Sequence, residues 1–292
     1  MRHLFFLLML SPMLSVQAQL EGMIDLHVHA APDSDLRSVD AYEVARMARR
    51  NGMQALLFKN HNTHTASLAY LVSQVVPEIG VYGGITLNKA VGGINPIAVR
   101  LMAETTNAHG RVVWMPTRDS EHAVRNSGGS SYVSISNDGE LLPEVLEVLD
   151  VIADFDLSLA TGHSSPAESL LLIQEARARG IEKIIVTHPF SPSVSMSPET
   201  QRAAAEMGAL LEYPISLSLG DDERFAKFVE QLRLVNTINV VLSTDLGQVG
   251  RPVPSDGLAL SIRRLIDAGI TNSEINVMTK RNPAQFLGLQ SR

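Results

Sequence analysis

Residues 23–29 read Met23-Ile24-Asp25-Leu26-His27-Val28-His29. This largely apolar stretch predicts a β-strand that runs into two histidines spaced i and i+2. Alternate side chains of a strand lie on the same face, so both imidazoles should point to one spot where the strand ends. Imidazole is the commonest metal ligand among side chains. The pair therefore predicts half of a metal site, and the alternative is a chance His-x-His on a solvated edge.

The same kind of apolar run returns along the chain, each time followed by a polar turn and a longer amphipathic segment. The eight runs are Met23–Leu26, Ala55–Phe58, Val81–Ile85, Val112–Met115, Leu157–Ala160, Ile184–Val186, Ala209–Leu211 and Val240–Leu242. Apolar strands that alternate with helices indicate a parallel sheet buried on both faces. Eight such units in 292 residues predict an α/β fold, a single-domain (β/α)8 TIM-type barrel over residues 19–292. A doubly wound open sheet is the alternative.

Capping patterns place helices between the runs. Asp40 precedes Glu43 by three residues, as a cap precedes its reciprocal partner. Asn95-Pro96, Ser165-Pro166 and Ser197-Pro198 each place a cap before a proline at the first helical position. The longest departure from the repeat is residues 118–140, rich in Ser, Asn and Gly. It predicts a long loop after the fourth strand that covers the site or contacts substrate.

Residues 1–18 differ from the rest of the chain. Arg2 and His3 precede the apolar run Leu4–Leu10, and Val16-Gln17-Ala18 supplies the small residues of a cleavage site. This order is typical of a secretory signal peptide, with cleavage expected after Ala18. The apolar run is shorter than the roughly 20 residues needed to span a bilayer, which counts against a membrane anchor. The sequence therefore predicts a periplasmic or secreted protein with no membrane insertion after cleavage.

Composition excludes several kinds of site and partner. The net charge of −7 gives no reason to expect nucleic acid or an anionic membrane as a partner. The chain has no cysteine, which excludes disulfides, thiolate metal ligands and a cysteine nucleophile. A metal would have to be held by histidine, by a carboxylate or by a modified lysine. The expected partner is a small-molecule substrate, and the composition is compatible with a homo-oligomer.

Polar residues that follow the predicted strands should meet, because the active site of such a barrel forms at the carboxyl ends of its strands. Six of the nine histidines follow a predicted strand closely. In chain order the residues at these ends are His27, His29, Lys59, His61, His64, Asn88, Lys89, Trp114, Arg118, His163, His188, Glu212 and Asp245.

The order of these residues resembles that of the amidohydrolase superfamily of metal-dependent hydrolases. The similar features are His-x-His after the first strand, single histidines after the fifth and sixth, and Asp245 after the eighth. The ending Asn282-Pro283-Ala284, followed by Leu287-Gly288, also resembles members of that superfamily. The resemblance covers the mature chain and is nearest to an uncharacterised branch. It implies that His27, His29, His163, His188 and Asp245 hold one or two divalent metal ions.

Neutral imidazoles with one carboxylate suit Zn²⁺, with Mn²⁺, Fe²⁺, Co²⁺ or Ni²⁺ as alternatives. A metal in this site activates water for attack, and Asp245 is the expected general base that takes up the proton. Glu212 is expected to support the ligands rather than to bind the metal. We expect His61, His64, Asn88, Lys89, Trp114 and Arg118 to bind substrate. The alternatives are supporting roles for the two histidines and plain surface positions for the two cations.

One feature departs from the superfamily pattern. Binuclear members usually bridge their metals with a carboxylated lysine or a glutamate after the fourth strand, where this chain has Trp114-Met115-Pro116. Lys59, after the second strand, is the lysine placed to substitute as a carbamylated bridge, which would make it part of the metal site and the catalytic machinery. The alternative is that Lys59 stays cationic and binds substrate or pairs with an acidic neighbour.

These features favour a hydrolase that cleaves an amide, lactone, ester or phosphoester bond of a small molecule. A phosphoesterase of the polymerase-and-histidinol-phosphatase type is a second hypothesis, although its usual Asp-x-His ending differs from Asp245-Leu246-Gly247. A metal-dependent decarboxylase is a third, because such enzymes reuse the same ligands. A non-catalytic periplasmic protein that binds a metal or ligand is the fourth.

Overall fold

The computed structural model describes residues 20–289, so the predicted signal peptide lies outside the described residues. Eight parallel strands form the main sheet, in the order β1 (Ile24–Val28), β2 (Ala55–Phe58), β3 (Gly80–Thr86), β4 (Gly110–Trp114), β7 (Ser158–Ala160), β8 (Ile184–Val186), β9 (Leu210–Pro214) and β10 (Val240–Ser243). Each predicted apolar run forms one of these strands, and strands that follow one another in the chain pair with one another. The predicted (β/α)8 barrel is confirmed.

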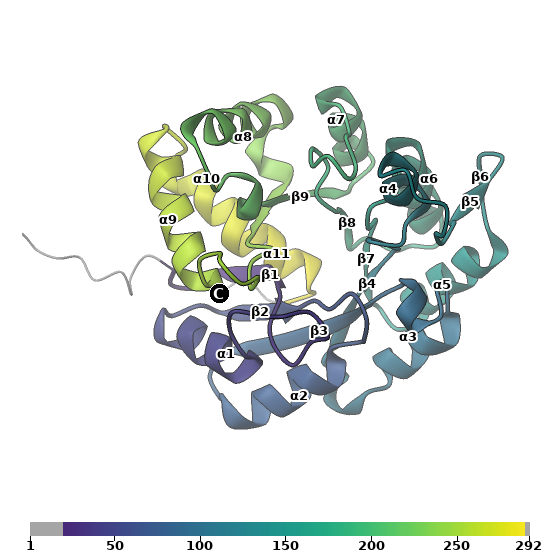
Figure 1. Ribbon diagram of the computed structural model, residues 1–292, viewed down its shortest axis with the longest axis horizontal. Helices are drawn as coiled ribbons and strands as arrows, with labels where there is room; N and C mark the ends of the chain where they lie inside the picture. The colour runs from purple at the N-terminus through teal and green to yellow at the C-terminus, as the bar shows by residue number, and fades with distance from the viewer. Residues whose placement is uncertain (1–19, 290–292) are drawn as a thin grey trace, which may run out of the picture.

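Helices surround the sheet (Figure 1). They are α1 (Ala41–Arg50), α2 (Ala66–Val75), α3 (Pro96–Ala103), α5 (Pro143–Asp154), α6 (Pro166–Ala178), α7 (Pro198–Glu206), α8 (Asp222–Val235), α9 (Pro254–Asp267), α10 (Asn272–Asn276) and α11 (Asn282–Phe286). The predicted caps Asp40, Asn95, Ser165 and Ser197 each accept a hydrogen bond from a backbone N–H in the first turn of a helix. No helix within residues 20–289 is long and apolar enough to cross a membrane.

The barrel closes between β1 and the segment that follows β10. The backbone N–H of Asp245 donates to the carbonyl of His27 at 2.8 Å, and the N–H of His29 donates to the carbonyl of Leu246 at 2.9 Å. Gly247 makes this approach possible, because a Cβ at that position would lie 1.8 Å from the carbonyl oxygen of His29. The closure excludes the open-sheet alternative. It also brings β1 and β10, the first and last strands of the sheet, together beside His27 and His29.

The side chain of Asp25 also stabilises this closure, the seam between β1 and the segment that follows β10. Its carboxylate accepts hydrogen bonds from the backbone N–H of Thr244 at 2.9 Å, from the Thr244 hydroxyl at 2.6 Å and from the His27 N–H at 3.1 Å. Burial raises the pKa of Asp25 to about 7, although these hydrogen bonds act in the opposite direction. The three donors make the buried carboxylate a link between β1 and the end of β10.

The barrel interior has an apolar floor and a polar top. Ile24 and Leu26 of β1 pack inside with side chains from β2, β4, β8 and β10, and Phe286 of α11 packs against the same cluster. The β1–β2 register shifts between Asp25 and Val28. After the shift Val28 packs with the outer core under the helices, while His27 contacts groups inside the barrel. A local irregularity of this kind is a common way to re-aim side chains near a site.

The long loop predicted after the fourth strand is more ordered than its composition suggested. It contains the short helix α4 (Glu121–Asn126) and a hairpin of β5 (Ser136–Asn137) and β6 (Glu140–Leu141). The Ser120 hydroxyl donates to the carbonyl of His163 at 2.8 Å, which ties the start of the loop to the end of β7. These elements are too short to leave a periodic pattern in the sequence.

We expect Asp25→Leu to destabilise the metal-free protein by roughly 2–4 kcal/mol, because it leaves buried donors of Thr244 and His27 unpaired. Asp25→Asn is the matched control: it keeps an acceptor oxygen and should lose less than half as much. Urea unfolding measures both variants. An Asp25→Leu variant as stable as the wild type would show that the carboxylate does not hold the seam.

Candidate metal centre

Three ligand atoms form a nearly equilateral triangle at the carboxyl end of the barrel. His27 Nε2 lies 3.2 Å from His29 Nε2, and each of these nitrogens lies 3.2 Å from Asp245 Oδ1. The two histidines come from β1 and the turn after it, and Asp245 follows β10, so the triangle spans the closure seam. Both histidine side chains are buried, while 22% of the Asp245 side chain is exposed. Asp245 is therefore the member of the triangle that faces solvent most.

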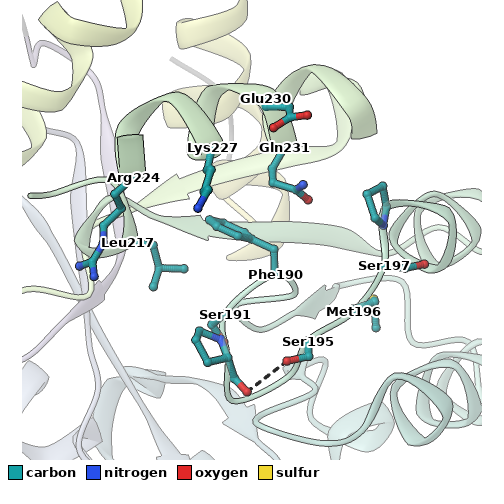
Figure 2. Close-up of a pocket in the computed structure, with 12 residues that line it drawn as sticks. Phe190, Ser191, Ser195, Met196, Ser197, Leu217, Arg224, Lys227, Glu230 and Gln231 are labelled. Atoms are coloured by element: carbon teal, nitrogen blue, oxygen red, sulfur yellow. Dashed lines mark hydrogen bonds between the residues drawn. The ribbon is translucent and has the colours of Figure 1, made fainter. Parts of the chain in front are cut away.

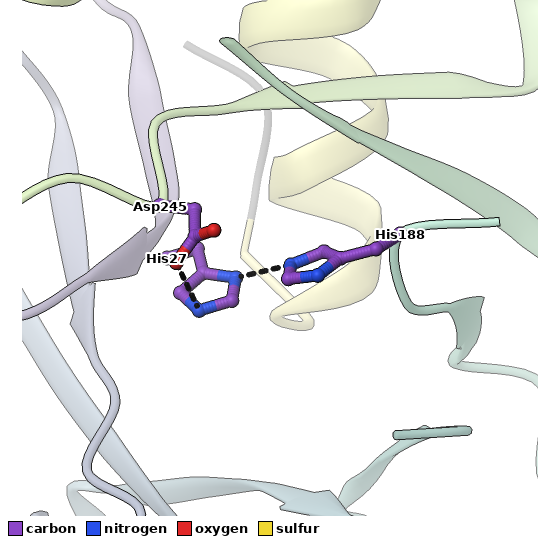
Figure 3. A group of neighbouring side chains, drawn as sticks. All are labelled: His27, His188 and Asp245. Atoms are coloured by element: carbon purple, nitrogen blue, oxygen red, sulfur yellow. Dashed lines mark hydrogen bonds and ion pairs between the residues drawn. The ribbon is translucent and has the colours of Figure 1, made fainter. Parts of the chain in front are cut away.

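His188 approaches His27 from the opposite side. His188 Nε2 lies 3.2 Å from His27 Nδ1, and the two rings stack with centroids 4.9 Å apart. Figure 3 shows His27, His188 and Asp245 pointing toward one another, His27 from β1 and the other two from the segments that follow β8 and β10. Each of the three offers a ligand atom within 4.8 Å of the others, so the group could hold a metal ion.

His163 lies next to His188 and extends the cluster. Their ring centroids are 5.6 Å apart. His163 Nε2 is buried and has no hydrogen-bond partner within the described part of the chain. A buried, unpaired imidazole nitrogen is costly unless another group takes up its lone pair. The structure therefore brings all four histidines named as ligands, together with Asp245, to one end of the barrel.

Burial favours the neutral form of these histidines. It lowers the pKa of His27, His29 and His163, and it lowers the pKa of His188 to about 4. Burial also opposes the ionisation of Asp245, but the contacts with His27 and His29 outweigh it and hold the pKa of Asp245 well below its usual range. Neutral imidazole and ionised carboxylate are the protonation states that bind metals.

Lys59 follows β2 directly and is buried beside the cluster. Its Nζ has no hydrogen-bond partner among residues 20–289 and lies 5.3 Å from the centre of the Trp114 ring. Burial lowers the pKa of Lys59 to about 8, although Glu212 and Asp245 act in the opposite direction. The amine is thus less basic than that of an exposed lysine, and it makes no hydrogen bond within residues 20–289.

Of the residues predicted to bind substrate, His61 and Trp114 lie nearest the cluster. The His61 ring stacks on His29 with centroids 5.2 Å apart, and its Nδ1 lies 2.9 Å from the Thr117 hydroxyl. Trp114 packs against His27 with centroids 6.5 Å apart. Asn88 is buried behind them, and its amide is engaged by the His61 carbonyl and by Thr117.

The other predicted substrate residues lie farther out. Arg118 pairs with Asp35 at 2.6 Å. The Lys89 ammonium donates to Ser131 and lies 3.7 Å from Asp119. His64 is exposed in the turn after β2. The two cations thus have partners in the loops, and within residues 20–289 the structure shows no hydrogen bond or ion pair between His64 and the cluster.

Sequence patterns did not single out two hydroxyl groups of the site. The Ser216 hydroxyl donates to Asp245 Oδ2 at 3.2 Å from the short 3-10 turn Ile215–Leu217 after β9. The Ser243 hydroxyl donates to Glu212 Oε1 at 2.7 Å. Ser243 stands two residues before Asp245, a signal that could have found it, whereas nothing in the sequence around Ser216 marks it.

A pocket of about 700 Å³ opens beside the cluster, between the loop after β8 and helix α8. Figure 2 shows Phe190 at its centre, with Lys227 and Gln231 of α8 on one wall and Ser195 on the other. The backbone N–H of Ser191 in this loop donates to the carbonyl of His188. The pocket therefore lies beside the histidine cluster, and the histidines themselves do not line it.

Comparison with known proteins gives one family and a set of similar folds. The profile of a family described as "Family of unknown function (DUF6282)" matches residues 22–212. A search of curated proteins finds no significant match.

Solved structures match most of the chain. The phosphotriesterase homology protein from Escherichia coli, complexed with phosphate in its active site, is 16% identical; the match covers 92% of this chain and 99% of that one, with a TM-score of 0.58. An amidohydrolase from Pseudomonas aeruginosa is 12% identical over 93% of this chain and 97% of its own, with a TM-score of 0.63. A mutant organophosphorus hydrolase from Deinococcus radiodurans is 17% identical over 93% and 94%, with a TM-score of 0.57. At these identities the likeness is one of fold.

Proposed function

The chain belongs to the family of unknown function DUF6282, and we propose that this member is a metal-dependent hydrolase of the amidohydrolase type. Its substrate would be a small molecule with an amide, lactone, ester or phosphoester bond. The observation that carries the proposal is the triangle of His27 Nε2, His29 Nε2 and Asp245 Oδ1, with 3.2 Å edges. The similar folds of an amidohydrolase and an organophosphorus hydrolase support it.

The triangle fits the geometry of zinc. Bonds of about 2.0–2.1 Å in a tetrahedral site place ligand atoms roughly 3.3 Å apart, close to the 3.2 Å edges found here. The donors are imidazole nitrogen and carboxylate oxygen, which suit Zn²⁺ and several other divalent ions. His163 Nε2 is buried without a hydrogen-bond partner in the described chain, and a second ion beside His188 would engage this atom. We propose one or two divalent ions per chain.

The protein's own groups would divide the reaction among them. A divalent ion supplies Lewis-acid polarisation and lowers the pKa of water. Asp245 Oδ2, held by the Ser216 hydroxyl at 3.2 Å, would accept the proton and pass it to the leaving group. His61 and Trp114 would form the wall against which the substrate packs. Arg118 and Lys89 would bind an anionic part of the substrate only by exchanging their present loop partners.

Asp245→Asn tests the function. The variant should lower kcat/KM by about 10²–10⁴-fold, because its amide cannot take up the proton. Metal content of purified protein is measured by elemental analysis, and hydrolysis is assayed with chromogenic lactones, phosphotriesters, carboxylic esters and amides. Asp267→Asn, at an exposed position of α9, is the control and should behave as the wild type.

We expect at least one divalent ion per chain and chelator-sensitive hydrolysis of one substrate class. Purified protein that takes up no divalent metal would contradict the proposal. Release of CO2 from a carboxylated substrate without hydrolysis would favour the decarboxylase alternative. A metal-loaded chain inactive on every class would favour a binding protein.

Lys59 is the group we propose as a carbamylated ligand. Its neutral amine would attack CO2, forming an N–C bond and releasing one proton, which leaves a carboxylate on the former Nζ. Its burial, its lack of a hydrogen-bond partner within residues 20–289 and its lowered pKa of about 8 support this chemistry. The product would supply the carboxylate that this chain lacks after β4.

Lys59→Ala should then lose one metal equivalent, and added short-chain carboxylate should partly restore activity by replacing the missing ligand. Lys59→Arg is the comparison variant, because arginine keeps the positive charge and cannot form a carbamate. Metal content and turnover are measured for all three proteins. Lys59→Arg with full metal content and near-normal turnover would rule out the carbamate and leave a cationic substrate contact.

We also propose that residues 1–18 direct export and are removed. The support is the sequence alone: basic residues, a short apolar run and a small residue at Ala18. Amino-terminal sequencing of the periplasmic fraction should start at Gln19. A sequence that starts at Met1 would contradict export by this route.

A further inference from the structure

Glu212 is an acidic side chain buried inside the barrel. It lies on β9, paired in register with Val241 of β10, and only 3% of its side chain is exposed. Its chain neighbours Leu211 and Tyr213 belong to the core outside the sheet, so Glu212 projects into the interior. A buried carboxylate is costly unless it is paired and hydrogen-bonded. The groups that contact the Glu212 carboxylate therefore indicate the role of this side chain.

One oxygen of Glu212 is engaged twice. His27 Nδ1 lies 2.7 Å from Oε1, and the Ser243 hydroxyl donates to the same oxygen at 2.7 Å. An ionised carboxylate can accept hydrogen bonds but cannot donate them, so the His27 nitrogen at this contact carries the hydrogen. Neutral imidazole has one N–H, and the lone pair must then be on Nε2. That is the atom in the triangle with His29 and Asp245.

The other oxygen of Glu212 makes no hydrogen bond within residues 20–289. This oxygen, Oε2, is buried and lies 3.5 Å from His188 Nε2. A residue that only tied β9 to its neighbours would gain nothing from this arrangement, because leaving a buried oxygen unpaired costs stability. The two carboxylate oxygens of Glu212 lie near two different histidines of the cluster, Oε1 near His27 and Oε2 near His188.

We propose that Glu212 is a positioning residue of the metal centre, which acts through His27. It selects the His27 tautomer with hydrogen on Nδ1 and directs Nε2 toward the ion. This inference rests on the proposed function, since it needs a metal at the triangle. Carboxylates that accept from a ligating histidine typically change metal affinity by 10–100-fold when they are removed.

The test uses the full mature chain, stripped of metal and titrated with Zn²⁺ against a competing chelator. Glu212→Ala should bind about 10–100-fold more weakly than the wild type at the same stoichiometry. Glu212→Gln keeps the shape and an acceptor oxygen and should fall in between, so it carries the test if the alanine variant does not fold. Ser243→Ala should weaken binding in the same direction by less. Glu182→Gln, at an exposed position, is the control and should match the wild type.

A second measurement reads the tautomer directly. Imidazole nitrogen chemical shifts of the ¹⁵N-histidine-labelled, zinc-loaded wild type should place the hydrogen of His27 on Nδ1 and the metal on Nε2. The shifts of His27 should change in Glu212→Gln and stay constant in Glu182→Gln. A merely structural glutamate would change stability without changing these shifts.

The outcomes separate this inference from the proposed function. Wild-type protein that binds no divalent metal overturns both. Metal-binding wild type with Glu212 variants of unchanged affinity overturns the role of Glu212 alone. Zinc bound to Nδ1 of His27 in the wild type would likewise overturn the role of Glu212 alone. A loss of one metal equivalent in Glu212→Gln, with unchanged affinity for the other, would overturn the positioning role and make Glu212 a direct ligand.

Discussion

The hydrogen bonds that close the barrel between β1 and the residues after β10 also build the candidate site. Asp245 N–H donates to the His27 carbonyl, and His29 N–H donates to the Leu246 carbonyl. Three of the converging side chains therefore belong to residues whose backbones form the seam. If the seam shifted by one residue, alternate side chains would face the other side of the sheet. Barrel closure and site geometry thus depend on the same few contacts.

Burying the polar side chains at the carboxyl end of the barrel costs free energy of folding. Three carboxylates are buried or half-buried there: Asp25 on β1, Glu212 on β9 and Asp245 just after β10, with Lys59 directly after β2. Hydroxyl groups of Thr244, Ser243 and Ser216 each donate to one of the carboxylates. Each carboxylate thus accepts at least one side-chain hydrogen bond, while Glu212 Oε2, Lys59 Nζ and His163 Nε2 stay unpaired in the described chain. Unpaired buried polar groups concentrated in one place are typical of a functional site.

Much of the fold could be predicted, because eight nearly continuous apolar runs carry a strong local signal. Ala55–Phe58 and Ile184–Val186 form strands with the predicted bounds. Other ends differ: β9 extends to Pro214, which places Glu212 within the strand and not after it. Helix α4 and the β5–β6 hairpin were not predicted, since six residues and two pairs of residues are too short for a periodic pattern. Lys89 and Arg118 follow strands as expected, but their loop partners are remote in the sequence.

The sequence by itself determined the number and order of the strands, the end of the barrel at which His27, His29 and Asp245 lie, and the absence of thiolate ligands. These follow from hydrophobic periodicity, chain order and composition, all of which are local. Tertiary structure alone decided that His27 faces Glu212, a residue 185 positions away, and that Lys59 is buried without a partner in the described residues. Distances between side chains from separate strands depend on the stagger and closure of the whole barrel, and no local pattern encodes them.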